Sequence, residues 1–466
     1  MNNMKKNKSI LTLILLFLIC NVVAAQNIKI KGKVNEPNAL VRLLTYNDML
    51  TYEQTTACET KSDDKGNFLI QAEINDVTMA QVAVNLERVD LLIKPGANYE
   101  MEILIPEQKE NVSYFERESP TLKIINIDDD GIYSQYHISN MIIDDFLYEN
   151  FNQLYRNRRI SLLDTLDAVI KRNIPEIKSD FVKDNIRYRK AAIQMVVNAD
   201  NGKKVVNQYF DKQPVLYSNP AYMNLFHELF ANYLALNQFN PSELRYMLYQ
   251  DYDNFMSYLK GKDAFLAENQ NLAEVIVAFN LKRMFYELQN DRKVILDKLN
   301  YIAQNAKNQK NKEIVKDILK QINRLSFNSE APAFSLKDKN GDMVELADYK
   351  DDMLLVQFVN KVSSMTDYQF EMLKDFSNQW QDTIQIVTIA TKESFNDFEK
   401  LFEEKNYRWK LLNIENEILL LEKYQVKTFP DYVIIGPNGK IGMSPAPSPE
   451  QYLDFHVRRL YKYYKK

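Results

Sequence analysis

Apolar and polar residues alternate along the first part of the chain. The stretch Ile28–Val34 reads IKIKGKV, which has the two-residue period of a half-buried strand. Similar runs continue to residue 105, and turn residues such as those at 64–67 and 95–96 separate them. This pattern predicts a small antiparallel β-sandwich over residues 27–105.

The apolar period becomes helical further along, and we expect a mainly α-helical region over residues 106–326. Asn219 and Pro220 predict the cap and first turn of one helix, and Asn240 with Glu243 predicts a capping box at the start of another. Aromatic and aliphatic side chains recur on one face of the first of these helices, at Tyr222, Leu225, Phe226, Leu229, Phe230 and Tyr233. We interpret this stripe as the core of a helix bundle, and a ligand groove is the alternative.

Strand and helix patterns alternate over residues 329–466. Leu354–Phe358 is apolar at every position except Gln357, which is typical of a buried strand, and Thr383–Ala390 predicts a second strand parallel to it. A hairpin turning at Pro437–Lys440 and a helix over residues 449–464 complete the pattern. Such alternation predicts an α/β domain, so the fold class expected for the whole chain is multidomain α+β.

The first 25 residues have the character of a signal peptide. Three lysines form a basic start, Ile10–Val23 is mostly apolar, and Ala24-Ala25 offers small residues for cleavage before Gln26. The apolar run is short for a membrane span, and we find no transmembrane segment in the mature chain. We expect export to the periplasm or outer envelope, and lipoprotein anchoring through Cys20 is the alternative.

Charge and ligand spacing exclude several classes of partner. Loss of the signal peptide removes three lysines and takes the net charge from −4 to −7, which argues against nucleic acid. Neither His137 nor His227 has a second ligand at metal spacing. Asp128–Gly131 lacks the spaced ligands and distal Glu of an EF-hand, so we interpret it as a solvated turn rather than a calcium loop. We expect neither a metal nor a cofactor.

Cysteine is scarce in this sequence. Of the two cysteines, Cys20 leaves with the signal peptide, so Cys58 has no intramolecular partner in the mature chain. We interpret Cys58 as a small buried hydrophobe, and an intermolecular or reactive role is the alternative.

The C-terminal segment resembles the TlpA/ResA-type thioredoxin-like family over residues 329–466. The elements that match, in order, are Ala331-Pro332, Phe334, Leu336, Asn340-Gly341, Leu346, Asp348-Tyr349-Lys350 and Leu354–Phe358. The resemblance implies a thioredoxin-like fold with a cis-proline at Pro430, preceded by Thr428 and Phe429. The N-terminal strands resemble a β-rich domain that often precedes such domains, through Gly32–Val34 and the turn before Phe68.

Members of that family usually have Cys-x-x-Cys where the helix follows the central strand, and this sequence has no cysteine there. Counting from the strand places Ser363 and Thr366 at the two cysteine positions, with Ser364 and Met365 between them. Aligning on a later Glu-Met pair shifts the two positions to Met365 and Tyr368.

Neither alignment supplies a thiol. Thiol-disulfide exchange needs a thiolate, which a helix N-terminus stabilises, and a hydroxyl cannot replace it. We therefore expect a degenerate, redox-inactive turn in which Ser363 or Thr366 caps the helix. A catalytic serine would need a nearby base, and His456 is the only histidine of the domain.

The resemblance also implies a binding surface, because relatives accept an extended peptide beside the cis-proline. Here that surface would comprise Thr428, Phe429, Pro430 and the turn at 362–366. The leading hypothesis is an exported, redox-inactive protein that binds or scaffolds envelope proteins or extended peptides. One alternative is a TlpA-type thiol-disulfide oxidoreductase that uses Cys58 with a partner's thiol. Another is a peptide- or glycan-binding protein that uses the helical region.

Overall fold

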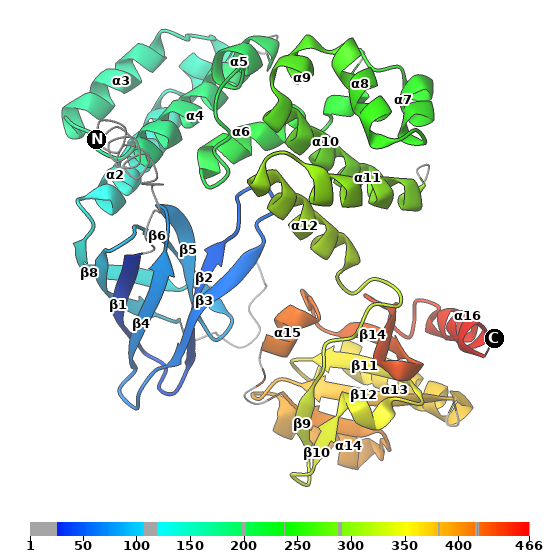
Figure 1. The fold of residues 1–466 in the computed structure, drawn as a ribbon. Helices are drawn as coiled ribbons and strands as arrows, with labels where there is room; N and C mark the ends of the chain where they lie inside the picture. Colours follow the sequence, from blue (N-terminus) through cyan, green and yellow to red (C-terminus); the bar gives the residue numbers. More distant parts are fainter. Residues whose placement is uncertain are drawn as a thin grey trace, which may run out of the picture. The chain divides into compact units, whose positions relative to one another are not determined.

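The computed structural model describes residues 26–465, apart from 107–118, 198–201, 237, 288–290, 381–382, 415–416 and 418. The proposed signal peptide and Cys20 lie outside the described residues. The chain divides into two compact units, residues 1–317 and 318–466 (Figure 1). The predicted fold class is confirmed: N-terminal β-sheets are followed by helices and then by an α/β domain.

Two four-stranded sheets open the first unit, with strand orders β4-β1-β7-β8 and β3-β2-β5-β6. Alternating side chains such as Ile30 and Leu43 point inward from the two sheets and share one buried core, as the two-residue period predicted. The strands are β1 (Gln26–Val34), β2 (Leu40–Tyr46), β3 (Gln54–Lys61), β4 (Asn67–Ile74), β5 (Thr78–Val84), β6 (Glu87–Ile93), β7 (Asn98–Leu104) and β8 (Thr121–Asp128).

Two features of these sheets differ from the prediction. Strand β1 pairs with β7 in parallel, although a purely antiparallel sandwich was expected. The chain reaches β7 from the other sheet, so no tight turn forces the two strands to run in opposite directions. The sandwich also continues past residue 105, because β8 pairs with β7 from within the range expected to be helical.

The helices that follow the sandwich begin at Ile132 and include both predicted caps, and the last of them, α12, crosses the boundary between the two units. The Asn219 side chain accepts a hydrogen bond from the Tyr222 backbone N–H, and that of Asn240 accepts from Glu243. The helices are α2 (Ile132–Glu149), η2 (Asn152–Arg156), α3 (Leu162–Asn173), α4 (Asp180–Val197), α5 (Gly202–Tyr209), α6 (Pro220–Phe230), η3 (Tyr233–Ala235), α7 (Pro241–Leu248), α8 (Tyr252–Lys262), α9 (Ala264–Glu268), α10 (Gln270–Phe285), α11 (Arg292–Asn305) and α12 (Gln309–Asn323).

The loop between β2 and β3 joins the sandwich to these helices. The Met49 backbone N–H donates to the Tyr217 carbonyl at 2.8 Å, and the Tyr52 hydroxyl donates to Asn224 at 3.0 Å. Met49 and Leu50 are both 2% exposed. The loop therefore supplies apolar anchors as well as hydrogen bonds, and the two regions pack as one compact unit.

The second unit is built on a seven-stranded sheet with the order β10-β9-β13-β12-β11-β14-β15. Its centre is parallel, because β12 pairs in parallel with both β11 and β13. The elements are β9 (Ser335–Asp338), β10 (Met343–Glu345), η4 (Leu346–Tyr349), β11 (Met353–Val359), α13 (Ser364–Trp380), β12 (Ile384–Ala390), α14 (Phe395–Lys405), β13 (Lys410–Asn413), α15 (Leu419–Lys423), β14 (Asp431–Gly436), η5 (Pro437–Gly439), β15 (Lys440–Met443) and α16 (Leu453–Tyr464).

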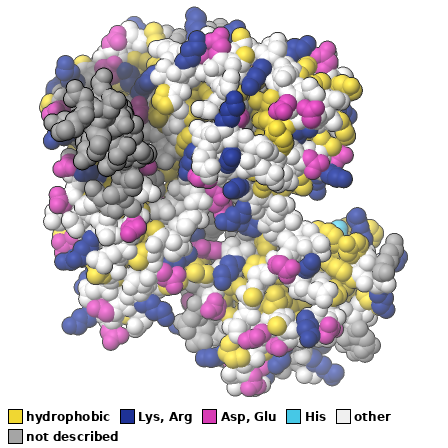
Figure 2. Space-filling view, viewed as in Figure 1, with side chains coloured by type: hydrophobic (Ala, Val, Ile, Leu, Met, Phe, Trp, Pro, Cys, Tyr) yellow, Lys and Arg dark blue, Asp and Glu magenta, His cyan; other side chains and the backbone are white. Residues whose placement is uncertain are grey.

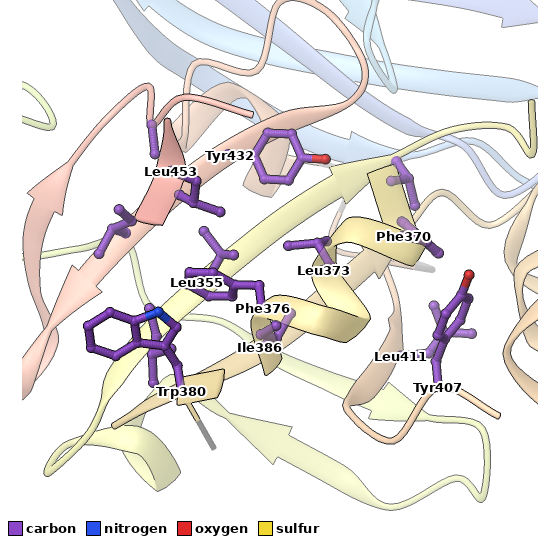
Figure 3. Close-up of a cluster of buried hydrophobic side chains, with 14 of the residues drawn as sticks. Leu355, Phe370, Leu373, Phe376, Trp380, Ile386, Tyr407, Leu411, Tyr432 and Leu453 are labelled. Carbon is purple, nitrogen blue, oxygen red and sulfur yellow. The ribbon is translucent and has the colours of Figure 1, made fainter. Parts of the chain in front are cut away.

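One buried cluster joins the sheet of this unit to three of its helices (Figure 3). Leu355 extends from β11, and Leu373, Phe398 and Val457 come from α13, α14 and α16. Every residue of β11 is buried, as the mostly apolar run predicted. This central strand leads directly into the turn before α13.

Candidate functional site

The turn before α13 is organised by two hydroxyl side chains. The Ser363 backbone N–H donates to Thr366 Oγ1 at 2.7 Å, and the Thr366 backbone N–H donates to Ser363 Oγ at 3.2 Å. Each residue thus satisfies a backbone donor of the other, in the reciprocal manner of a capping box. Two hydroxyl groups therefore cap the N-terminus of α13.

The two sequence alignments of this turn place different side chains at the cysteine positions. In the first, Ser363 Oγ and Thr366 Oγ1 lie 3.2 Å apart, and Thr366 is buried. In the second, Met365 and Tyr368 are 55% and 56% exposed. The structure brings together the pair from the first alignment, and Ser364 begins the helix between them.

The proline loop lies at the same end of the sheet as this turn. Phe358, near the end of β11, pairs with Asp431, the first residue of β14, so β11 leaves the sheet where β14 enters it. The Phe429–Pro430 peptide bond directly before β14 is cis. The sheet register therefore positions the loop at 428–430 and the turn at 363–366 at one edge.

The loop presents backbone groups and one acid. Thr428 is exposed, Phe429 and Pro430 are half-buried, and neither Thr428 nor Phe429 makes a hydrogen bond within the described residues. Burial raises the pKa of the Asp431 carboxyl, which accepts a hydrogen bond from the Tyr432 backbone N–H. Unpaired main-chain groups in an exposed loop are available to pair with an extended peptide.

A chain of hydrogen bonds, which we call the core relay, runs through the unit, and its three central bonds are buried. Each member donates to the next over 2.8–2.9 Å. From first donor to last acceptor, its members are Trp409, Thr388, Gln357, Tyr432, Gln369 and Glu450. The relay ends on a carboxylate, which accepts without needing to donate.

The centre of the core relay links the proline loop to α13. Tyr432 follows Pro430 by two residues, and its hydroxyl donates to Gln369, one turn beyond Thr366. Burial keeps the pKa of Tyr432 well above its ordinary value, so the hydroxyl remains a donor. Figure 3 shows Tyr432 among the core side chains beside α13. We did not predict this network, although Gln357 was a visible signal as a polar residue inside an apolar strand.

Other candidate groups lie apart from this turn or have local roles. Within the described residues, the Ser363 Oγ hydrogen bonds all involve Thr366, so no imidazole activates this serine. No cluster of His, Cys, Asp or Glu in the described part of the chain could bind a metal ion. Asp129 is buried and accepts from the backbone N–H of Tyr133, in the first turn of α2, at 2.7 Å, so the expectation of a solvated turn was wrong at this residue.

Cys58 lies on β3 opposite Leu43, in the first unit. It is half-buried and packs against the sandwich core, close to the expectation of a small buried hydrophobe. The thioredoxin-like segment from residue 329 onward contains no cysteine.

The aromatic stripe of α6 is mostly core, because Tyr222, Phe226 and Phe230 are fully buried. Leu229 is half-buried and Tyr233 is buried, and both also line a groove of about 780 Å³ beside α5 and α9. In that groove the Tyr233 hydroxyl donates to the Asp263 carboxylate at 2.7 Å. Among the described residues, none of the helices has both the length and the apolar character needed to span a bilayer.

The comparison with protein-family models agrees with this fold. Residues 327–444 match the model of the AhpC/TSA family, and no curated protein matches the chain. The thioredoxin domain of a thiol-disulfide oxidoreductase from Bacteroides vulgatus is 24% identical over 29% of this chain and 98% of its own, with a TM-score of 0.27. A thiol:disulfide interchange protein from Bacteroides sp. is 25% identical over 31% of this chain and 93% of its own, with a TM-score of 0.27.

A third solved structure is the exposed lipoprotein thioredoxin of Streptococcus pneumoniae. It is 19% identical over 27% of this chain and 99% of its own, with a TM-score of 0.23. The family match falls on the seven-stranded sheet and the turn described above. The predicted relationship is thereby confirmed for this part of the chain: residues 327–444 form a thioredoxin-like domain that matches the AhpC/TSA family model.

Proposed function

We propose that this protein is exported and uses its thioredoxin-like domain to bind protein partners, without thiol-disulfide chemistry. The observation behind the proposal is the turn before α13, where Ser363 and Thr366 bond to each other's backbone at the N-terminus of the helix. Exchange with a disulfide requires a thiolate to attack and a second thiol to resolve the mixed intermediate. A hydroxyl pair can do neither.

The surface around this turn is suited to a peptide. Val362, Met365 and Tyr368 are 41%, 55% and 56% exposed and form an apolar border to the turn. The free backbone groups of Thr428 and Phe429 could pair with an extended strand. An extended segment with apolar side chains would therefore meet main-chain partners in the loop and apolar contacts beside the helix.

The binding proposal is tested by crosslinking in the envelope fraction. We expect Phe429→Ala to lose partners that the native chain captures, since Phe429 is half-buried in the proline loop. Phe151→Ala is the matched control, because Phe151 is 54% exposed in the other unit. Unchanged capture by Phe429→Ala would remove the proline loop from the proposal.

The absence of redox chemistry is tested separately with an insulin-reduction assay. The purified native chain should show no turnover above the uncatalysed rate, and Cys58→Ser should behave identically. A TlpA-type oxidoreductase is the alternative, and it would use Cys58 with a partner's thiol. Turnover abolished by Cys58→Ser, with a mixed disulfide at Cys58 by mass spectrometry, would establish that alternative.

Export is proposed from the N-terminal sequence: a basic start, an apolar run and small residues before Gln26. Cell fractionation with N-terminal sequencing tests it. A mature chain starting at Gln26 in the periplasm or outer envelope is the expected result, and a lipid-modified Cys20 would establish the anchored alternative.

Peptide or glycan binding by the helical region is a second candidate, favoured by the groove at Leu229 and Tyr233. A thermal-shift screen against peptides and glycans tests it, with Tyr233→Phe as a variant. A ligand that raises the melting temperature of the native chain alone would support this function.

A further inference from the structure

The last helix of the chain, α16, has two different faces. Leu453, Val457 and Leu460 point inward and are at most 7% exposed. The opposite side, which we call the aromatic–basic face, comprises Tyr452, Phe455, Arg459, Lys462 and Tyr463. Phe455, Arg459, Lys462 and Tyr463 fall on one side of the helix because residues three, four and seven apart share a face. Tyr452 is the N-cap residue just before the first turn and has a left-handed backbone.

Large aromatic rings on this face are unusually exposed. Tyr452, Phe455 and Tyr463 are 82%, 61% and 53% exposed. Phe327, itself 47% exposed, extends the surface and meets the Tyr463 ring edge-on, with centroids 5.1 Å apart. Figure 2 shows hydrophobic side chains gathered over the α16 part of this unit, with Lys and Arg side chains beside them. Contiguous exposed apolar surface of this kind marks an interaction site.

Positive charge is concentrated on the same helix, although the chain as a whole carries a net charge of −4. The single acid of α16, Asp454, already accepts from Arg458 Nε at 2.7 Å and from Trp380 Nε1 at 2.8 Å. Arg459 and Lys462 are exposed and have no acidic partner within the described residues. The aromatic–basic face therefore presents uncompensated positive charge between aromatic rings.

From this combination we infer that the aromatic–basic face docks on an anionic membrane surface. Amphipathic rings such as Tyr place an apolar body below the headgroups and a polar tip at their level, and Lys and Arg side chains extend to the phosphates. Anionic headgroups supply the negatively charged partners that Arg459 and Lys462 do not have within the described residues. The centre of a protein–protein interface is depleted of lysine but is also rich in aromatic residues and arginine, so a second copy of this chain is the occupant that the test must distinguish. The proposed peptide site lies at the N-terminus of α13, whereas α16 contacts Trp380 at the C-terminus of that helix. The inference therefore does not depend on the peptide site.

The test is cosedimentation of the full chain with vesicles of phosphatidylcholine alone or mixed with phosphatidylglycerol. We expect tighter binding to the anionic vesicles, and that difference should disappear at high salt. The double variant Arg459→Gln/Lys462→Gln should bind anionic vesicles about 30-fold more weakly, from the contribution of each cation near the surface. The pair Lys171→Gln/Arg172→Gln, exposed on α3, has the same charge change and should bind as the native chain does.

All of these chains keep residues 1–25, so any membrane affinity of the apolar N-terminal segment cancels in the comparison. Phe455→Ala should weaken anionic binding severalfold and leave the circular dichroism spectrum unchanged. Equal binding by the Arg459→Gln/Lys462→Gln variant and the native chain would overturn the inference. Concentration-dependent self-association in sedimentation velocity, lost in Phe455→Ala while vesicle binding is unchanged, would also overturn it by identifying a second copy as the occupant.

Discussion

Ser363 Oγ and Thr366 Oγ1 lie 3.2 Å apart at the N-terminus of α13, where the family resemblance implies a pair of thiols. The same two residues exchange hydrogen bonds with each other's backbone N–H groups. Local hydroxyl groups thus cap the N-terminus of this helix.

Replacing both hydroxyls with thiols should create a redox site. In Ser363→Cys/Thr366→Cys, the positive end of the α13 dipole would favour the thiolate at the cap position, and the second thiol would resolve the mixed disulfide. We expect this variant to reduce insulin in the presence of a dithiol reductant. Ser363→Ala/Thr366→Ala is the control and should remain inactive. A double-cysteine variant that forms no internal disulfide would show that the turn does not have the geometry we assign to it.

The cap should contribute measurably to stability. Thr366→Val keeps the shape of the side chain and removes the oxygen that accepts from the Ser363 N–H, so we expect a loss of about 1 kcal/mol in the free energy of unfolding. Urea denaturation followed by tryptophan fluorescence reports on this unit, since both tryptophans, Trp380 and Trp409, lie in it. Thr428→Val, at an exposed position of the same unit, is the control, and an equal effect of both changes would contradict the capping role.

Breaking the core relay at its centre should lower the free energy of unfolding by more than the loss of the cap does. Tyr432→Phe removes the hydroxyl that accepts from Gln357 and donates to Gln369, and Gln357 is fully buried. Leaving buried amide groups without partners costs about 1–3 kcal/mol. The same fluorescence measurement tests this, with the exposed Tyr463→Phe as the reference change. A Tyr432→Phe variant as stable as the native chain would mean that water or a rearranged amide replaces the hydroxyl.

The unit should also lose stability in acid through Asp338. This buried carboxylate accepts from Lys410 Nζ at 2.7 Å and from the backbone N–H groups of Asn340 and Asp342, and the Lys410 contact foremost lowers its pKa. Because the folded pKa is lower than the unfolded one, the stabilisation is complete above the ordinary pKa of Asp. It is lost as the pH falls through that value toward the lowered one.

Comparing the native chain with Asp338→Asn tests this dependence. The difference in unfolding free energy between the two should be largest near neutral pH and should shrink as the carboxylate is protonated in acid. A difference that stays constant from pH 6 to acid would contradict the assignment of the ionised state to Asp338.

Local sequence patterns were sufficient to predict many of the strands and helices. The two-residue period of the first strands, the stripe of α6, the caps at Asn219 and Asn240 and the apolar run of β11 all predicted elements that the structure contains. These signals depend on residues within a few positions of one another, so the sequence alone reveals them. The absence of a thiol before α13 is likewise a property of the sequence itself.

Contacts between distant positions were not predictable in the same way. The Glu243 carboxylate, expected to close a capping box, instead pairs with Lys262, which only the packing of α7 against α8 brings near. The parallel pairing of β1 with β7 depends on how the chain crosses between two sheets.

The sequence by itself determined the succession of strand-rich, helical and α/β segments, the thioredoxin-like character of the last segment and the absence of cysteine from it. The tertiary structure placed Ser363 Oγ and Thr366 Oγ1 next to each other at the helix N-terminus, and it joined Gln357, Tyr432 and Gln369 into the core relay. The physical reason is that periodicity and capping act along the chain, whereas a hydrogen bond between residues 75 positions apart exists only once the sheet register has placed both partners.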